Sequence, residues 1–173
     1  MDEAASKTRR SILELRLVEV SPSYRGAPNW SAVSIIIDGQ ELVGESSDVY
    51  MGGTFDPEDE LGGGFGWEPE RILGPNSPLL PTSQARRVAV YTCSCGEVGC
   101  GNRAPIISET NGIVFWNDVR AVTAYFTGPD TYEEPEDFND ISDYVSARAP
   151  RADFSFDSTQ YRAEIARATI AFL

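Results

Sequence analysis

The chain has 173 residues, of which 41% are hydrophobic and 10% aromatic, so it can form one domain with its own core and is not a disordered polymer. Its net charge of −13 argues against direct binding to nucleic acid or to an anionic membrane surface, because both repel carboxylates. No run of residues approaches the roughly 20 apolar side chains that a membrane-spanning helix needs.

The N-terminal residues and the cysteines bear on where the protein works. Residues 1–10 are polar and lack the apolar core of a signal peptide. Three cysteines are an odd count packed into 93–100, whereas a secreted disulfide framework spreads an even number of cysteines along the chain. We therefore expect a flexible segment at 1–10, one domain over 11–173 and a cytoplasmic location.

The first 43 residues predict three antiparallel strands in succession. Residues 11–20 alternate apolar and charged side chains until the phase slips at Val18, which predicts a strand with a bulge. Asp38-Gly39 lies between two apolar runs and is typical of a two-residue hairpin turn, since both turn residues need positive φ.

Residues 44–84 are rich in glycine and proline and predict a long loop region. So many residues without secondary structure would be unusual, so we expect a short element at 46–51 or at 67–73. The run Gly62-Gly63-Gly64-Phe65-Gly66 lacks the Lys-Ser/Thr that follows the glycines of a phosphate-binding loop, and a flexible hinge is the better interpretation.

The second half predicts further strands and one helix. Residues 86–92 alternate toward the cysteines, Asn111-Gly112 lies between apolar runs and predicts a second hairpin, and 119–126 favours a strand over a helix. Asp157-Ser158 is a good N-cap pair, and the apolar residues after it recur at helical spacing: Tyr161, Ile165, Ala168 and Phe172. The expected fold is α+β, mostly antiparallel sheet with a C-terminal amphipathic helix.

The stretch from Cys93 to Cys100 is the most unusual local feature. If the strand continues, Cys93 and Cys95 point to the same face, and the glycines between Cys95 and Cys100 allow a reversal that returns Cys100 toward them. Three converging thiolates would suit zinc. The chain has no histidine, so the fourth ligand would have to be Glu97, Asp118, a water or a group from a partner.

Two other interpretations of the cysteines remain open. Cys100 could form a redox-active disulfide with Cys93 or Cys95, or all three could be small buried side chains in a glycine-rich turn, which is the interpretation we favour. The absence of histidine also removes the commonest general base. We predict no catalytic residue and favour a protein that is not an enzyme.

Two segments carry the charge surplus and are called the acidic segments below. Residues 45–70 hold eight acidic and no basic side chains, and residues 129–143 hold seven and none, while the rest of the chain is close to neutral. Aromatic side chains lie within both, which is typical of a surface that binds a basic protein, as an immunity-type inhibitor does. The alternative is a pair of solvated loops. The residues we expect at such an interface are Asp56, Glu58, Asp59, Glu60, Glu133, Glu134, Glu136 and Asp137.

Three motifs in the second half resemble a group of uncharacterised bacterial proteins. They are Cys-x-Cys-Gly-Glu-x-Gly-Cys at 93–100, Trp-x-Asp-x-Arg at 116–120, and Phe-x-Phe-Asp at 154–157 before a C-terminal helix. The resemblance implies no activity and assigns no role to a residue. It makes six residues our first choices for one local cluster: Cys93, Cys95, Cys100, Trp116, Asp118 and Arg120.

Overall fold

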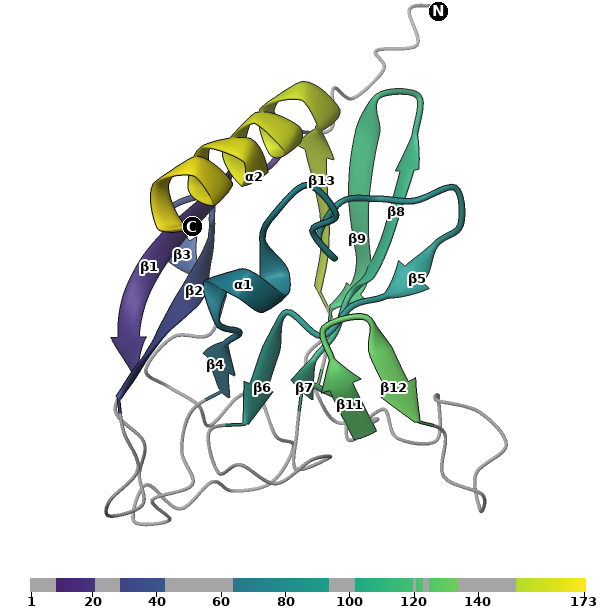
Figure 1. Ribbon diagram of the computed structural model, residues 1–173. Coiled ribbons are helices and arrows are strands. Elements are labelled where there is room, and N and C mark those ends of the chain that lie inside the picture. The colour runs from purple at the N-terminus through teal and green to yellow at the C-terminus, as the bar shows by residue number, and fades with distance from the viewer. Residues whose placement is uncertain are drawn as a thin grey trace, which may run out of the picture.

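The computed structural model describes residues 9–20, 29–42, 64–93, 102–119, 121–122, 125–133 and 152–173. Antiparallel sheets make up most of these ranges, and one long helix ends the chain, as the α+β prediction requires (Figure 1). Among the described residues, no helix has both the length and the apolar character that crossing a membrane requires.

The predicted three-stranded meander at the N-terminus is confirmed. Its strands are β1 (Leu13–Val20), β2 (Trp30–Ile37) and β3 (Gln40–Glu41), paired antiparallel in that order. Asp38 and Gly39 have φ of 53° and 81°, as the predicted hairpin turn requires. The bulge predicted in β1 is wrong, because β1 and β2 pair without interruption from Leu13 opposite Ile37 to Val20 opposite Trp30. The phase slip instead marks a change in which face of β1 is buried: Leu13 and Leu15 are buried before it, and Val20 is buried after it.

The region predicted as a long loop contains two elements within its described part. These are β4 (Gly64–Gly66) and α1 (Pro69–Ile72), so the short element expected at 67–73 is confirmed, while 46–51 lies outside the described residues. The hinge interpretation is wrong for Gly64 to Gly66, which form a strand. A Cβ atom on Gly66 would lie 1.8 Å from the carbonyl oxygen of Val33, so glycine allows β4 to approach β2 closely.

Two four-stranded antiparallel sheets form the rest of the strand framework. One has the order β10 (Ala121–Val122), β7 (Asn102–Arg103), β6 (Tyr91–Cys93) and β4, and the other has β13 (Ala152–Asp157), β9 (Ile113–Val119), β8 (Ile106–Thr110) and β5 (Arg86–Arg87). Along the chain, β5 is followed by β6, β7 by β8 and β9 by β10. One sheet has the neighbours β5, β8 and β9 in that order, and the other has β6, β7 and β10, which are the strands that adjoin them in the chain. The two sheets are therefore halves of one sheet that bends between them.

The bend interrupts the strand predicted over 86–92. The amide N–H of Val88 donates to the carbonyl of Pro105 at 2.9 Å and that of Val90 to the carbonyl of Arg103 at 2.8 Å, so hydrogen bonding continues through it. Pro105 has no N–H to donate, which suits a position where the regular ladder ends. Residues 88–90 are completely buried, so the bend lies in the core.

Two hairpins complete the sheets. Asn111 and Gly112 have φ of 51° and 74° between β8 and β9, which confirms the second predicted hairpin turn. Strand rather than helix is also confirmed in the described part of 119–126, which contains the end of β9, all of β10 and the start of β11 (Tyr125–Gly128). β11 pairs with β12 (Thr131–Glu133) to form the last hairpin.

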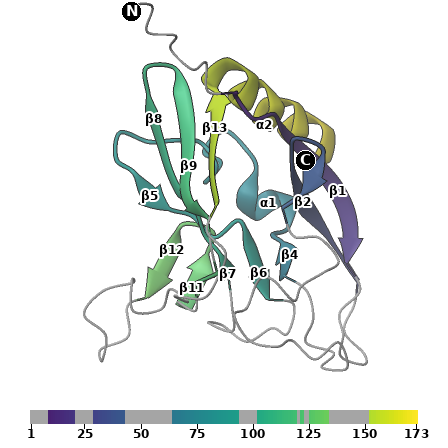
Figure 2. The same ribbon diagram turned by 180° about the vertical axis from the view of Figure 1, so that it is seen from behind.

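The predicted C-terminal helix is α2 (Ser158–Phe172). Its N-cap is Asp157, whose Oδ1 accepts a hydrogen bond from the amide of Gln160 at 2.9 Å. Tyr161, Ile165 and Ala168 are buried, as their spacing predicts. Figures 1 and 2 show α2 crossing one end of the molecule, while β4, β6, β11 and β12 lie toward the other end.

An aromatic cluster packs α2 onto the sheet. Trp116 lies edge-on to Phe156 with ring centroids 5.6 Å apart, and its Nε1 donates to the hydroxyl of Tyr161 at 3.0 Å. The Tyr161 hydroxyl in turn donates to the carbonyl of Leu79 at 2.8 Å. Complete burial of these side chains stabilises the fold by roughly 1.5–3 kcal/mol each, and the hydrogen bonds satisfy their polar atoms.

Candidate functional site

The outer edge of β1 is the most distinctive surface of the described structure. Backbone groups alternate along a strand, so the even-numbered residues of β1 bond to β2 and the odd-numbered ones point their N–H and C=O groups away from it. At the start of this edge, the amide of Ser11 donates to the carbonyl of Ser155 at 2.7 Å, and Ser11 forms a bridge with Phe156 of β13. The first outward position is therefore occupied by another strand.

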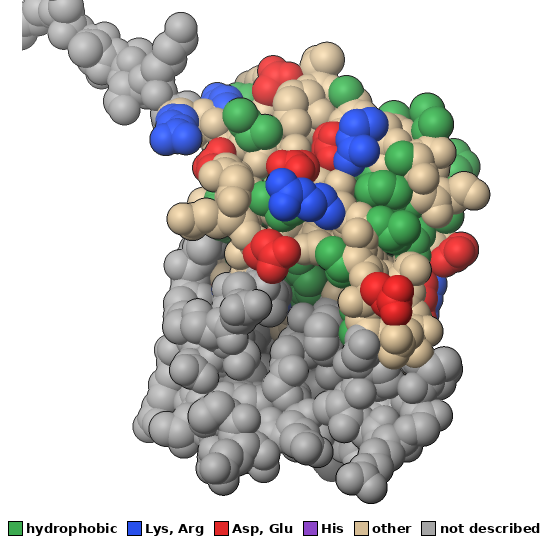
Figure 3. Space-filling model, turned by 90° about the vertical axis from the view of Figure 1, so that its left-hand side faces the viewer, with side chains coloured by type: hydrophobic (Ala, Val, Ile, Leu, Met, Phe, Trp, Pro, Cys, Tyr) green, Lys and Arg blue, Asp and Glu red, His purple; other side chains and the backbone are tan. Residues whose placement is uncertain are grey.

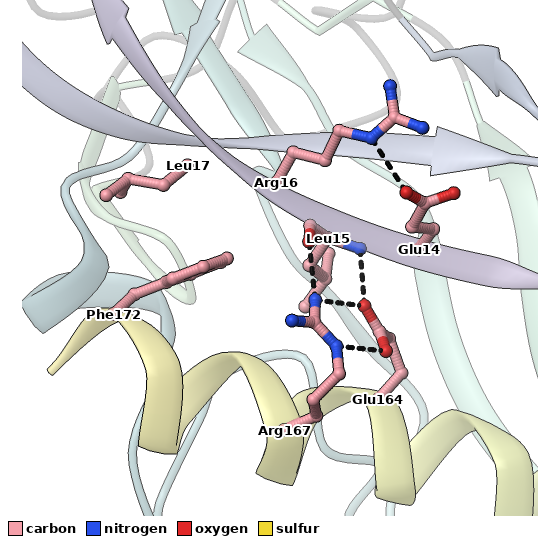
Figure 4. Close-up of a pocket in the computed structure, with 7 residues that line it drawn as sticks. All are labelled: Glu14, Leu15, Arg16, Leu17, Glu164, Arg167 and Phe172. Atoms are coloured by element: carbon pink, nitrogen blue, oxygen red, sulfur yellow. Dashed lines mark hydrogen bonds and ion pairs between the residues drawn. The ribbon is translucent and has the colours of Figure 1, made fainter.

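Side chains of α2 occupy the next two outward positions. The carbonyl of Leu13 accepts a hydrogen bond from Gln160 Nε2 at 2.9 Å. The amide of Leu15 donates to Glu164 Oε1 at 2.7 Å, and its carbonyl accepts from Arg167 Nη2, also at 2.7 Å (Figure 4). Gln160, Glu164 and Arg167 have the spacing i, i+4 and i+7, so they lie on one stripe of the helix. That stripe takes the place of a neighbouring strand.

Beyond Leu15, no residue of the described ranges bonds to this edge. Leu17 and Glu19 are the next outward positions, and within the described part of the chain their outward backbone groups have no hydrogen-bond partner. We call Leu17–Glu19 the open edge. Unpaired groups at a sheet edge can bond to a further strand.

A hollow of about 550 Å³ lies beside the open edge. Its apolar lining is Leu15, Leu17 and Phe172, and Leu17 is 45% exposed. Two ion pairs flank this lining, Arg16 with Glu14 and Arg167 with Glu164, each at 2.7 Å. In Figure 4, Leu17 and Phe172 lie on one side of the hollow and the Arg167–Glu164 pair on the other. Figure 3 shows hydrophobic side chains gathered beside charged ones on this face.

The electrostatics keep Glu164 and Arg167 charged. Burial by itself would raise the pKa of Glu164, but its hydrogen bonds with Arg167 and with the amide of Leu15 lower it below the usual value of 4.5. The hydrogen bond with Glu164 also raises the pKa of Arg167. The exposed carboxylate of Glu19 accepts from Asn29 Nδ2 at 2.8 Å and has no cationic partner within the described ranges.

A second polar cluster lies at the bend of the sheet. Arg87 Nη2 contacts Asp118 Oδ2 at 2.8 Å, and Arg87 Nη1 donates to the carbonyl of Ala104 at 2.6 Å. The two side chains are only 9% and 10% exposed. Arg87 belongs to β5, Ala104 precedes β8 and Asp118 belongs to β9, and these three strands are neighbours in one sheet. The cluster therefore connects the three strands where the sheet bends. Its contacts indicate a structural role.

A bulge directs Asp118 into this cluster. Two residues of β9, Asn117 and Asp118, lie opposite Asp153 alone, because the pairing shifts between Ala152 opposite Val119 and Phe154 opposite Trp116. Asp118 has φ of 55°, a left-handed conformation that aspartate tolerates better than most residues, and its amide donates to Asp153 Oδ1 at 2.7 Å. Bulges often redirect a side chain in this way.

The cysteine stretch connects two paired strands. Cys93 ends β6 opposite Gly64 of β4, and Thr92 lies opposite Asn102 of β7. Cys95, Glu97 and Cys100 lie outside the described residues. Within the described ranges, no three cysteine or carboxylate side chains are grouped so that they could hold a metal ion. Asp118, considered as a fourth ligand, is engaged by Arg87.

The residues of the Trp-x-Asp-x-Arg motif have different surroundings. Trp116 contacts Phe156 and Tyr161 in the core below α2, whereas Asp118 pairs with Arg87 at the bend. Arg120 lies outside the described residues. The motif therefore supplies one core residue and one residue of the buried ion pair.

Most of the predicted interface also lies outside the described residues: Asp56, Glu58, Asp59, Glu60, Glu134, Glu136 and Asp137. Glu133 is the last residue of β12. Asp130, in the second acidic segment, pairs with Arg86 at 2.5 Å. β4 follows the first of these stretches in the chain and β12 precedes the second. Both strands lie at the end of the molecule opposite α2 (Figures 1 and 2).

Sequence reasoning missed the open edge and its helical cover. One signal could have indicated the cover: Gln160, Glu164 and Arg167 form a polar stripe directly beside the apolar stripe of the same helix. A second signal was the phase slip after Leu17, because only one of the two apolar phases can face the core at that point. Neither signal identifies the partner strand, because the sequence does not say which strand lies at an edge.

Comparison with known proteins identifies no relative, since no family model, curated protein or solved structure matches this chain.

Proposed function

We propose that this chain is a non-enzymatic acidic protein that binds a basic protein partner, in the manner of an immunity-type inhibitor. The observation that carries the proposal is how the described arginines are used. Four of the five described ion pairs join an arginine to a carboxylate outside the acidic segments: Arg16–Glu14, Arg87–Asp118, Arg162–Glu109 and Arg167–Glu164. The fifth joins Arg86 to Asp130 of the second acidic segment.

Four described arginines are therefore bonded to carboxylates that lie outside the acidic segments. An arginine already bonded to one carboxylate contributes little to neutralising another, so the negative field of the acidic segments is available to a partner. A field of this kind accelerates association with a basic surface and disfavours anionic ones. The proposal includes a cytoplasmic location, where three cysteines can stay reduced.

The test is binding of the native partner as a function of salt and of charge. Neutralising four residues of the first acidic segment by Asp56→Asn, Glu58→Gln, Asp59→Asn and Glu60→Gln should weaken co-purification at least tenfold at low salt. Raising the salt from 50 to 500 mM should weaken the unaltered protein similarly, because screening shortens the range of the field.

A matched control removes the same charge elsewhere. Asp38→Asn, Glu41→Gln, Glu109→Gln and Asp157→Asn also neutralise four acids, but on the described scaffold and away from the hollow. This control should retain most of the binding. A partner whose affinity is indifferent to salt, or an equal loss in both quadruple variants, would count against an acidic docking surface.

We propose a zinc site at Cys93, Cys95 and Cys100 as the alternative function, structural or catalytic. The observation that favours it is the direct pairing of Thr92 with Asn102, which holds together the two strands that flank the cysteine stretch. Native mass spectrometry of the purified chain should then detect one zinc ion, which is lost after chelation and in Cys93→Ser. A fully folded protein that contains no metal when purified would remove this alternative.

A further inference from the structure

We propose that the open edge of β1, together with the hollow beside it, binds an extended segment of the basic partner as an added antiparallel strand. The choice of a basic segment rests on the proposed function, whereas the strand geometry does not. The outward positions of β1 are occupied in turn by Ser155 of β13 and by the stripe on α2, and no other described residue occupies the positions after Leu15. A docked strand continues this series.

The backbone of the open edge fits this role. Leu17 and Glu19 each direct one N–H and one C=O outward, and a strand lying against them would satisfy all of these groups. β1 keeps its full pairing with β2 on the opposite side, so docking needs no rearrangement of the sheet. Antiparallel addition is chosen because antiparallel pairs outnumber parallel ones about two- to three-fold.

The side chains specify the chemistry of the docked segment. A residue directly opposite Leu17 would lie over the hollow against Leu17 and Phe172, so an apolar side chain fits there. A residue opposite Glu19 would lie beside a carboxylate that has no cationic partner within the described ranges, so a basic side chain fits there. In an antiparallel strand the basic residue then precedes the apolar one by two positions.

A second copy of this chain fits the edge less well. Antiparallel pairing of two open edges would bring Glu19 of one copy opposite Leu17 of the other, which places a carboxylate against an apolar side chain. Each copy also carries a net charge of −13, so the two would repel each other. The edge therefore favours a basic segment of a different protein.

The probe is a capped peptide, Thr-Thr-Arg-Val-Leu-Thr-Thr, added to the ¹⁵N-labelled full chain. Hydrogen exchange of the Leu17 and Glu19 amides should slow at least tenfold at saturating peptide, because both become bonded. Two control peptides, one with Glu in place of Arg and one N-methylated at Leu, should not protect them. Protection confined to other residues, or none at all, would overturn the inference.

Variants at the edge provide the second measurement. Leu17→Pro removes the outward N–H without removing a bond to β2 and should weaken peptide binding at least tenfold, whereas Leu17→Thr keeps the N–H and should weaken it less. If Leu17→Pro does not fold, Glu19→Arg still tests the side-chain assignment, since it should reverse the preference between the Arg and Glu peptides. An unchanged preference would overturn the assigned chemistry.

The two proposals fail in different ways. If the native partner binds through the acidic segments but neither it nor the peptide protects the open edge, the strand-docking inference fails alone. If the peptide protects Leu17 and Glu19 while the native partner is indifferent to salt, the acidic docking function fails and the strand site remains.

Discussion

The carboxylate of Glu164 accepts a hydrogen bond from the backbone amide of Leu15 at 2.7 Å, so a helix side chain occupies a position that a neighbouring strand would otherwise fill. Arg167 completes the arrangement by bonding both to Glu164 and to the carbonyl of Leu15. Edge strands are prone to unwanted pairing, and covering half of this edge limits where another strand can attach. The half that no described residue covers is the open edge.

The Glu164 contact should make part of the stability depend on pH. Because the folded-state pKa of Glu164 lies below 4.5, its contribution is present above the unfolded-state value near 4.5 and is lost as the pH falls through the folded-state value. We expect Glu164→Gln to lower the free energy of unfolding by roughly 1–2 kcal/mol at pH 7 and by less at pH 3. Urea unfolding at both pH values measures the difference, with the exposed Glu70→Gln as the control. An equal effect at both pH values would contradict this role.

Gly66 should not tolerate a side chain. A methyl group there would lie against the carbonyl oxygen of Val33, a backbone atom that cannot move aside cheaply. We expect Gly66→Ala to lower the free energy of unfolding by about 1–3 kcal/mol or more. Gly128→Ala is the matched control, because its Cβ would be 3.8 Å from the nearest atoms. Similar urea midpoints for the two variants would refute the close approach of β4 to β2.

The ion pair at the bend should show strong coupling. Asp118→Asn preserves a residue that tolerates φ of 55° but leaves Arg87 without its counter-charge, and breaking a buried pair costs about 3–5 kcal/mol. Combining it with Arg87→Met should recover part of the loss, because the remaining charge is then removed. A double-mutant cycle from urea unfolding gives the coupling energy. The exposed Arg16–Glu14 pair serves as the comparison, and we expect no measurable coupling there because solvent screens both charges.

The hydroxyl of Tyr161 should contribute to the free energy of unfolding. Tyr161→Phe keeps the aromatic packing but leaves the buried N–H of Trp116 without the acceptor it has in the structure. We expect a loss of about 1–3 kcal/mol. Thermal or urea unfolding measures it, and Trp116→Phe combined with Tyr161→Phe should cost less than the sum of the single changes. Additive losses would show that the two groups do not depend on each other.

Local sequence signals predicted the elements that depend on neighbouring residues. Asp38-Gly39 and Asn111-Gly112 specified two turns, because few residue pairs adopt positive φ at both positions. The spacing of Tyr161, Ile165 and Ala168 specified α2 and its buried face, and the N-cap followed from Asp157. These signals act over a few residues and can be recognised without knowledge of the fold.

The same reasoning could not find interactions between distant segments. The run at Gly62 to Gly66 resembled a hinge because glycine is flexible by itself, and only contact with Val33 shows that Gly66 is needed for close packing. Asp118 was singled out as a metal ligand or cluster member, but its partner Arg87 lies 31 residues earlier in the chain. Sequence spacing says nothing about such a pairing.

Sequence alone determined where the chain turns, which residues of α2 are buried and where the negative charge is concentrated, because these properties depend on residues close together in the chain. Tertiary structure decided that the sheet bends at Val88 to Val90, that Arg87 contacts Asp118, and that side chains of α2 bond to the outer edge of β1 at Leu15. These features depend on which strands become neighbours. Strand order results from the packing of the whole core, and no local pattern encodes it.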